Sequence, residues 1–376
     1  MIRVLHVVHG LFKSGGLANC VMNYYRNIDR TQVQFDFLYF IENDYSFRDE
    51  IESLGGRCFR LNEPSLSFNY RKESDEFFKL HNGEWIAMHC HALFAAALFG
   101  DSAKKNGIPC IIAHAHSTVY GKGIIRKMRN YAIIQMTRWT ADYYVACGEK
   151  AGRFLFGNKA YNRGKVTIFN NAINIEKFAF SIDNRQKIRK ELGIGDNLVL
   201  GHVGGFAGVK NHTFLIDIFV EILKRVPNSF LLLAGGEGTA SGSTKSEIVA
   251  KVNALGISEY VKFLGVRSDI FAVLSALDVY CQPSIFEGMP ISVIEAQTCG
   301  LPCVLSDTIT RGVDIGNSTF LPLSESAEYW AETIIQKCSC CSSREQGILL
   351  AQKAGFDIKV VVSDMLNFYK SISKNA

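Results

Sequence analysis

Two glutamates and a lysine are the residues of this sequence with the clearest capacity for chemistry. Glu287 and Glu295 lie eight positions apart, and Lys210 follows a glycine-rich turn. Paired carboxylates could serve as acid and nucleophile, or could accept hydrogen bonds from sugar hydroxyls. A fixed lysine could neutralise a phosphate whose negative charge grows during a reaction. What these side chains do depends on the elements that position them.

The segment around the two glutamates predicts a strand, a helix and a second strand. A buried strand is expected at Val279–Pro283, a helix from about Pro290 to Cys299, and a strand at Pro302–Ser306. Gly300 is a typical helix stop. Such a crossover predicts a right-handed unit of a parallel sheet, whose ligands lie at the carboxyl ends of its strands.

The start of the predicted helix is a candidate phosphate site. Its free amides and its dipole favour an anion near Gly288, Met289 and Pro290, and the glycine allows close approach. A carboxylate beside a phosphate would be repelled by it. Glu287 is therefore expected to hold sugar hydroxyls, and Glu295 a ribose.

The beginning of the chain repeats this pattern. A continuous apolar strand at Ile2–His9 precedes a loop with Gly15 and Gly16, after which a helix is predicted. A glycine pair between a first strand and a first helix indicates an anion cradle or a plain tight turn. The GxGxxG spacing of dinucleotide-binding proteins is missing, so hydride transfer loses its main support.

Histidines gather at the ends of two predicted strands. His114 and His116 end the strand that begins at Cys110, and His89 and His91 end the strand before it. Because ligands of doubly wound domains lie at these strand ends, His116 is a candidate binding residue.

The segment FEGMPISVIEAQTCGLPCV, residues 286–304, resembles the signature of the retaining glycosyltransferases of family 4. In that family two glutamates eight positions apart flank the donor site. The likeness runs along the whole chain and is most specific from Gly201 to Asp307. The likeness is strong to those members of the family that build bacterial capsular polysaccharides and exopolysaccharides.

The resemblance implies an α/β architecture called GT-B, in which two Rossmann-like, doubly wound domains face each other across a cleft. Residues 1–175 would form an N-terminal acceptor domain, and residues 176–356 a donor domain for the nucleotide sugar. A C-terminal helix within residues 357–376 would cross back to the first domain.

The resemblance also assigns roles to single residues. His116 would contact the transferred sugar, with His114 as its substitute, and Lys210 would neutralise the donor diphosphate. Relatives usually carry an arginine where Gly205 stands, and losing one such contact could cost about 3 kcal/mol, or ~100-fold in rate. Arg267 is a candidate substitute by its position.

The loops Gly235–Gly238, with Glu237, and Val266–Asp269, with Arg267, would hold the base and ribose of the nucleotide. Gly15 and Gly16 would lie near the donor phosphate. The resemblance implies no metal and no cofactor besides the nucleotide sugar itself.

Three functions remain open on the sequence. The leading one is a retaining glycosyltransferase that moves a sugar, expected to be UDP-linked, to a saccharide or lipid-linked acceptor in surface polysaccharide synthesis. The second is a non-catalytic partner that binds a sugar nucleotide, for which Gly205 is the support. A hydrolase is disfavoured, because eight helical residues span ~12 Å and its two carboxyls must lie within ~9.5 Å.

Composition excludes several classes of protein. A net charge of +5 over 376 residues does not indicate nucleic-acid binding. Eleven cysteines without paired spacing favour a reducing cytosol, and Cys338, Cys340 and Cys341 have no histidine or CxxC partner that would suggest zinc. The chain opens directly into a strand, so no export signal is expected, and no apolar run approaches the ~20 residues of a membrane span.

Residues 120–139 read YGKGIIRKMRNYAIIQMTRW, with five basic residues, no acid and several large apolar side chains. This pattern favours either a helix that covers the sheet or one that contacts an anionic membrane surface. Contact with the membrane would suit a lipid-linked acceptor, and it would put the protein at the inner face of the membrane.

Overall fold

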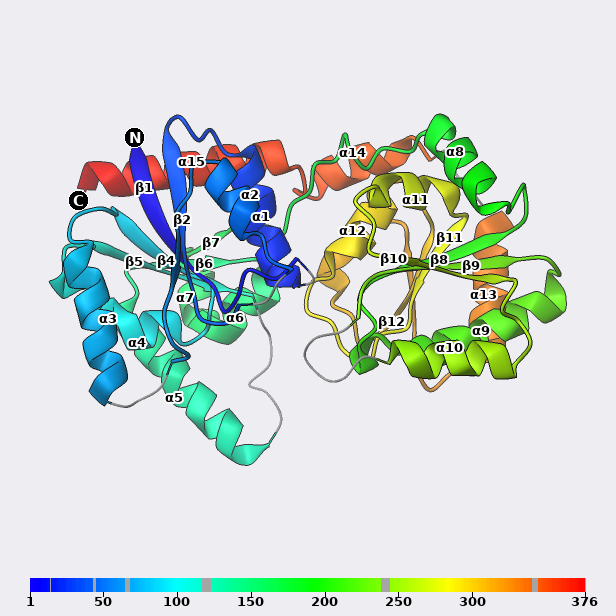
Figure 1. The fold of residues 1–376 in the computed structure, drawn as a ribbon, viewed down its shortest axis with the longest axis horizontal. Coiled ribbons are helices and arrows are strands. Elements are labelled where there is room, and N and C mark those ends of the chain that lie inside the picture. Colours follow the sequence, from blue (N-terminus) through cyan, green and yellow to red (C-terminus); the bar gives the residue numbers. More distant parts are fainter. Residues whose placement is uncertain are drawn as a thin grey trace. The chain divides into compact units, whose positions relative to one another are not determined.

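A computed structural model describes residues 1–13, 15–42, 45–64, 68–116, 123–237, 244–339 and 344–375 (Figure 1). The chain forms two compact units. Unit 1 comprises Met1–Ala172 together with Ile358–Ala376, and unit 2 comprises Ile173–Asp357. The sequence places the domain limits at 1–175, 357–376 and 176–356, close to these boundaries.

Unit 1 is built on a parallel seven-stranded sheet with the order β3-β2-β1-β4-β5-β6-β7. The order steps outward from β1 in both directions, which is the doubly wound arrangement and brings the ends of β1, β4 and β5 side by side. The strands are β1 (Ile2–Val7), β2 (Val33–Tyr39), β3 (Cys58–Arg60), β4 (Ala87–Cys90), β5 (Cys110–Ala115), β6 (Tyr143–Ala146) and β7 (Val166–Ile168).

Helices cover both faces of this sheet. The last helix, α15, packs on α1 and β1, whereas α3, α4, α5 and α6 form a connected layer (Figure 1). The helices of unit 1 are α1 (Gly16–Asn27), α2 (Arg48–Ser53), α3 (Phe68–Leu80), α4 (Ala95–Lys105), α5 (Ile124–Thr140), α6 (Glu149–Phe156), α7 (Asn158–Asn162) and α15 (Ile358–Asn375). The return of the C-terminal helix to the first unit, predicted from the sequence, is confirmed.

Unit 2 has a parallel six-stranded sheet with the order β10-β9-β8-β11-β12-β13. It too winds outward from its first strand, so the ends of β8 and β11 are neighbours. The strands are β8 (Val199–Val203), β9 (Phe230–Ala234), β10 (Val261–Gly265), β11 (Val279–Gln282), β12 (Cys303–Ser306) and β13 (Ser318–Leu321). The two doubly wound sheets predicted from the sequence are confirmed, although β13 was not predicted.

The helices of unit 2 also form two layers. One holds α9, α10 and α13, and the other holds α8, α11, α12 and α14 (Figure 1). Their bounds are α8 (Ile182–Leu192), α9 (His212–Arg225), α10 (Lys245–Ala254), α11 (Ile270–Ala276), α12 (Ile291–Thr298), α13 (Ala327–Ser339) and α14 (Gln346–Lys353), with short 3-10 turns η1 (Gly208–Lys210) and η2 (Arg311–Val313).

The crossover from β11 to β12 is the element on which the candidate chemistry depends. Pro290 was expected to begin the helix, but α12 starts at Ile291 and Pro290 is its N-cap, in an extended conformation (φ −69°, ψ 115°). Gly300 ends this crossover helix as predicted, with φ +72°. A side chain at this glycine would also collide with the backbone of Arg344, 2.3 Å from the position of a Cβ.

Candidate functional site

Glu287 lies in the loop after β11, and its carboxylate is held by residues of that strand end. Gln282 Nε2 and Ser284 Oγ each donate to Glu287 Oε1 at 3.3 Å. Both donors are completely buried. Ser284 is fixed in turn, because its carbonyl oxygen accepts hydrogen bonds from the hydroxyls of Ser306 (2.6 Å) and Thr308 (2.7 Å). The glutamate is therefore held in a defined orientation.

Lys210 completes this arrangement. Its Nζ lies 2.5 Å from Glu287 Oε1, and the side chains are only 19% and 16% exposed. Lys210 ends the turn η1, which follows β8, and the backbone amide of Ile285 donates to the carbonyl oxygen of Val209 at 2.8 Å. The loops after β8 and β11 are thus joined by one backbone bond and one ion pair. The lysine and the glutamate that the sequence singles out lie together, and we call them the Lys210–Glu287 pair.

The start of α12 is close to this pair in the chain. The first intrahelical bond runs from Val293 N to Pro290 O at 3.2 Å, so the amides before Val293 are not used within the helix. Ser292 belongs to a polar group at the end of β11, because it accepts from Tyr280 Oη at 3.0 Å. Met289 packs against the hydrophobic core of unit 2. The backbone of Glu287, just before Gly288, pairs with Ile309. An anion contact at Gly288 and Met289 stays a prediction from their place before the helix start.

Glu295 lies further along α12, in a different environment. Burial raises the pKa of its carboxyl group to about 7, and the nearby Lys177 only partly offsets this. A carboxyl group with this pKa exchanges its proton near neutral pH, unlike an ordinary surface glutamate. Glu295 is therefore not an ordinary exposed helix residue, and its expected contact with the ribose stays a prediction.

The raised pKa predicts a pH-dependent contribution of Glu295 to stability. From pH ~4.5 to ~7 the folded chain binds the proton of Glu295 more tightly than the unfolded chain, so stability falls as the pH rises through this range. The loss should reach at most about 3 kcal/mol. Urea unfolding at pH 5 and pH 8 should show this loss in the native chain and a correspondingly smaller one in Glu295→Gln. Identical pH dependence in both proteins would rule out the raised pKa.

The remaining candidates of unit 2 lie in the loops after β8, β9 and β10. At Gly205 a Cβ would lie 3.5 Å from the carbonyl oxygen of Gly236, which is an ordinary contact, so the backbone leaves room for a Cβ. Glu237 is exposed and forms an isolated bridge with Phe206. Arg267, the candidate substitute for the missing arginine, is held at 2.7 Å by both Glu191 and Asp269.

These two carboxylates also raise the pKa of the Arg267 guanidinium above its usual range. To reach a diphosphate, Arg267 would have to give up both ion pairs. We therefore expect that Arg267 does not hold the diphosphate.

In unit 1, the glycine turn and the histidines lie at strand ends. Gly15 is the N-cap of α1 and Gly16 its first residue, and a Cβ on Gly16 would meet nothing within 4 Å. Five histidines, His6, His89, His91, His114 and His116, come together at the ends of β1, β4 and β5. We call them the histidine cluster.

The histidine cluster is linked by hydrogen bonds on neighbouring strands. His6 Nδ1 lies 2.9 Å from His91 Nε2, His91 Nδ1 lies 2.9 Å from His116 Nε2, and His89 Nε2 lies 3.1 Å from His114 Nδ1. Burial lowers the pKa of all five imidazoles, that of His116 to about 3. At neutral pH every ring is therefore uncharged, with one donor and one acceptor nitrogen.

Sequence reasoning missed part of both sites. Gln282 and Ser284 could have been noticed as polar residues at the end of an apolar strand, and His6 as a polar residue inside one. Tyr369, which touches the histidine cluster, carries no local signal. Several expectations lie outside the described residues: Gly238, the segment 117–122, Cys340 and Cys341.

Comparison with known proteins supplies the family. The model of the family "Glycosyl transferases group 1" matches residues 184–339. The EpsF protein of Bacillus subtilis, named as a glycosyltransferase, is 35% identical over 98% of this chain and 96% of its own length. The chain is a group 1 glycosyltransferase.

Other relatives of this glycosyltransferase are more distant. A capsular polysaccharide biosynthesis glycosyltransferase of Staphylococcus aureus, CapH, is 24% identical over 99% of both chains. A UDP-Gal:α-D-GlcNAc-diphosphoundecaprenol α-1,3-galactosyltransferase of Escherichia coli is 25% identical over 61% of this chain and 59% of its own.

Solved structures bear out the fold. HepE of Anabaena, crystallised with UDP and glucose, superimposes with a TM-score of 0.77 over 99% of this glycosyltransferase and 100% of HepE, at 18% identity. The lipopolysaccharide glycosyltransferase WaaG gives a TM-score of 0.69 over 97% and 99% of the two chains, at 15% identity. The resemblance to family 4 and its GT-B fold is thus confirmed. Among the described residues, no helix has the length and hydrophobicity needed to span a membrane.

Proposed function

We propose that this glycosyltransferase takes a sugar from a UDP-sugar and attaches it, with retained anomeric configuration, to a saccharide or lipid-linked acceptor in surface polysaccharide synthesis. The observation that carries the proposal is the Lys210–Glu287 pair beside the start of α12. One cation, one oriented carboxylate and free helix amides at neighbouring strand ends match the charges and hydroxyls of a nucleotide sugar.

Each residue has a proposed task in unit 2. Lys210 and the amides near Gly288 and Met289 hold the diphosphate, which leaves with growing negative charge. Glu287 accepts hydrogen bonds from the sugar hydroxyls, since its oxygens are held in a fixed direction by their buried donors. Glu295 binds the ribose. In unit 1, His116 contacts the transferred sugar, a role that the resemblance to the family implies.

The choice of donor and acceptor is supported by relatives only. HepE was crystallised with UDP, and the Escherichia coli relative is named for a UDP-sugar and an undecaprenol-linked acceptor. EpsF and CapH support a place in polysaccharide synthesis.

In the proposed reaction the acceptor hydroxyl attacks on the face from which the nucleotide leaves, so no nucleophile of the enzyme is needed. We propose that this occurs in the cytosol and that the donor phosphates are neutralised without a metal ion.

Two steps test this function. Titration with UDP- and GDP-sugars should raise the melting temperature for one donor, because a ligand that binds the native state stabilises it. Incubation of that donor with a lipid-linked acceptor should then give a product whose new bond keeps the donor's anomeric configuration by NMR. Hydrolysis alone, an inverted product, or no donor binding at any concentration would contradict the proposal.

Gly205 supports a second candidate function. Without the usual arginine, the chain could be a non-catalytic partner that binds a sugar nucleotide for another transferase. The same experiment separates the two: a partner would bind the UDP-sugar and produce neither transfer nor hydrolysis.

Helix α5 supports contact with the membrane. Ile124, Ile125 and Met128 are 76%, 82% and 68% exposed, and Trp139 is 83% exposed. These apolar side chains share the helix with Arg126, Lys127 and Arg129, and α5 has no acidic residue. Apolar groups next to cations are typical of helices that lie on an anionic bilayer.

The double variant Ile124→Glu, Ile125→Glu should therefore bind vesicles of phosphatidylglycerol and phosphatidylcholine at least ~10-fold more weakly than the native chain. The variant loses two apolar side chains that would contact the bilayer. It also gains two negative charges, and an anionic membrane surface repels each of them by ~1 kcal/mol. Co-sedimentation measures the binding to these vesicles. Val360→Glu is the control, because Val360 is a half-exposed apolar residue of α15 and not of α5. Equal binding by the double variant and the native chain would exclude α5 as the contact.

A further inference from the structure

The hydrogen bonds of the histidine cluster extend through Tyr369 into one unbranched chain. Tyr369 Oη lies 2.6 Å from His89 Nδ1 and 3.5 Å from His6 Nε2. The chain therefore runs through His116, His91, His6, Tyr369, His89 and His114, in this order. It ends at His114 Nε2, a completely buried nitrogen without a hydrogen-bond partner. Leaving such an atom unsatisfied costs about 1–3 kcal/mol.

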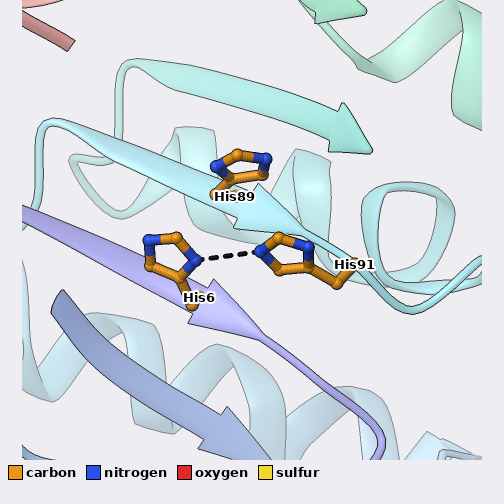
Figure 2. Close-up of side chains that lie close together, drawn as sticks. All are labelled: His6, His89 and His91. Carbon is orange, nitrogen blue, oxygen red and sulfur yellow. Dashed lines mark hydrogen bonds between the residues drawn. The ribbon is translucent and has the colours of Figure 1, made fainter. Parts of the chain in front are cut away.

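Two sets of three histidines in this cluster are close enough to share a ligand. His6, His89 and His91 form one set, and His91, His114 and His116 form the other, and in each set one nitrogen from every ring lies within 4.8 Å of the others. Figure 2 shows the first set, with His6 on β1 and the other two on and just after β4. All three of its rings are fully buried and already bonded to one another or to Tyr369.

The second set differs in two respects. It contains His114, whose Nε2 is the one nitrogen of the cluster that is fully buried and has no hydrogen-bond partner. It also contains His116, the only ring of the cluster that is partly exposed. An ion could thus reach this set from solvent, and it would occupy a nitrogen that is otherwise unsatisfied.

We propose that His91, His114 and His116 bind a divalent transition metal ion, Zn²⁺ in the first instance, with a fourth coordination position open to water or a hydroxyl group. Three imidazoles and one open position are a ligand set typical of zinc. His91 Nδ1 and His116 Nε2, now 2.9 Å apart, would separate to about 3.3 Å around a tetrahedral ion with Zn–N bonds of ~2.0 Å, and both rings would turn so that these nitrogens face the ion.

The surrounding residues supply the outer shell that metal-binding histidines require. With His91 bound through Nδ1, its Nε2–H donates to His6 Nδ1. With His114 bound through Nε2, its Nδ1–H donates to His89 Nε2. His6 and His89 then each direct their remaining N–H to Tyr369 Oη, whose oxygen can accept both. Each of these four histidines then has one N–H group, and each N–H donates a hydrogen bond. One set of tautomers is therefore compatible with metal binding, as in known sites.

This site lies in unit 1 and does not depend on the proposed donor chemistry of unit 2. It departs from the expectation, based on the family resemblance, that the protein needs no metal.

Metal binding is tested on the full chain without an affinity tag. After removal of metals with a chelator, Zn²⁺ is added, excess is removed by gel filtration, and bound metal is quantified. One Zn²⁺ per chain is expected, and Co²⁺ should give the intense visible bands of a tetrahedral complex. His116→Ala, which changes the partly exposed ligand, should lower the affinity for Zn²⁺ at least ~100-fold, because even outer-shell changes cost 10–100-fold.

Matched variants keep the result interpretable. His81→Asn changes a histidine of the same unit that pairs with Glu84 outside the cluster, and it should bind Zn²⁺ like the native chain. His6→Asn should weaken binding by less than His116→Ala, because it removes an outer-shell contact. Circular dichroism confirms that each variant is folded. Less than a tenth of an equivalent of Zn²⁺ on the folded native chain, or native affinity in His116→Ala, would overturn the proposal.

Discussion

Replacing Glu287 with alanine is expected to lower the rate of sugar transfer by about 10²–10³-fold while the affinity for UDP stays nearly unchanged. The proposed contact of Glu287 is with sugar hydroxyls, which UDP lacks at that position. Two buried donors, Gln282 and Ser284, aim its carboxylate, so the lost interaction is a preorganised one. Steady-state kinetics with the donor identified by the binding screen measures the first quantity, and calorimetry with UDP the second.

The ion pair between Glu287 and Lys210 gives a second reason why the affinity for UDP should not fall in Glu287→Ala. Lys210 Nζ is 2.5 Å from Glu287 Oε1, so a diphosphate that binds Lys210 must compete with this carboxylate. Without the carboxylate, Lys210 is available to the phosphate, and UDP affinity should not fall. Glu287→Gln keeps the shape and removes the charge, and it should share the loss of transfer.

Glu325→Ala is the control for a general effect of removing a carboxylate from unit 2, because Glu325 is exposed in the turn before α13. It should leave both transfer and UDP binding at native values. A loss of UDP affinity equal to the loss of transfer in Glu287→Ala would count against the assigned contact with the sugar.

Local signals in the sequence were enough to predict most of the fold. The apolar run at β1 and the Gly300 stop after α12 depend on neighbours within a few positions. The placement of Lys210 and Glu287 in one donor site came from the resemblance to the family, and the structure holds the two side chains together. The exact ends of helices depend on cap geometry and were predicted less well: Pro290 was expected to begin the helix and is its N-cap.

Contacts between distant parts of the chain could not be predicted. Tyr369 meets His6 across 363 positions, and nothing near either residue in the sequence indicates the other. Arg267 was a candidate for the diphosphate by its position in the loop, but Glu191, 76 positions away, pairs with it. Strand β13 has only four residues, Ser318–Leu321, between loops, and its pairing with β12 defines it more than its composition does.

Lys210→Met is expected to have the second large effect, a loss of about 100-fold in transfer rate together with weaker binding of UDP. Lys210 is the cation that the structure holds next to Glu287, and Gly205 stands where relatives carry a second one. Methionine keeps the length and apolar character of the side chain and removes only the charge. Kinetics and calorimetry should therefore show a loss in both quantities, unlike the selective loss in Glu287→Ala.

The missing arginine offers the reverse experiment. A Cβ at Gly205 would be 3.5 Å from Gly236 O, so Gly205→Arg can be accommodated without a backbone collision. If charge on the diphosphate limits the reaction, Gly205→Arg should raise the native rate and restore part of the activity of Lys210→Met. Lys224→Met, which removes an exposed lysine paired with Glu221 on α9, should change neither rate nor UDP affinity.

The outcome also separates the two candidate functions. A native chain without turnover that gains transfer activity from Gly205→Arg would be a binding partner that lost its catalytic cation. A native chain that turns over and is unaffected by Lys210→Met would contradict the proposed role of the lysine, because removing a fixed positive charge beside the leaving diphosphate should slow its departure.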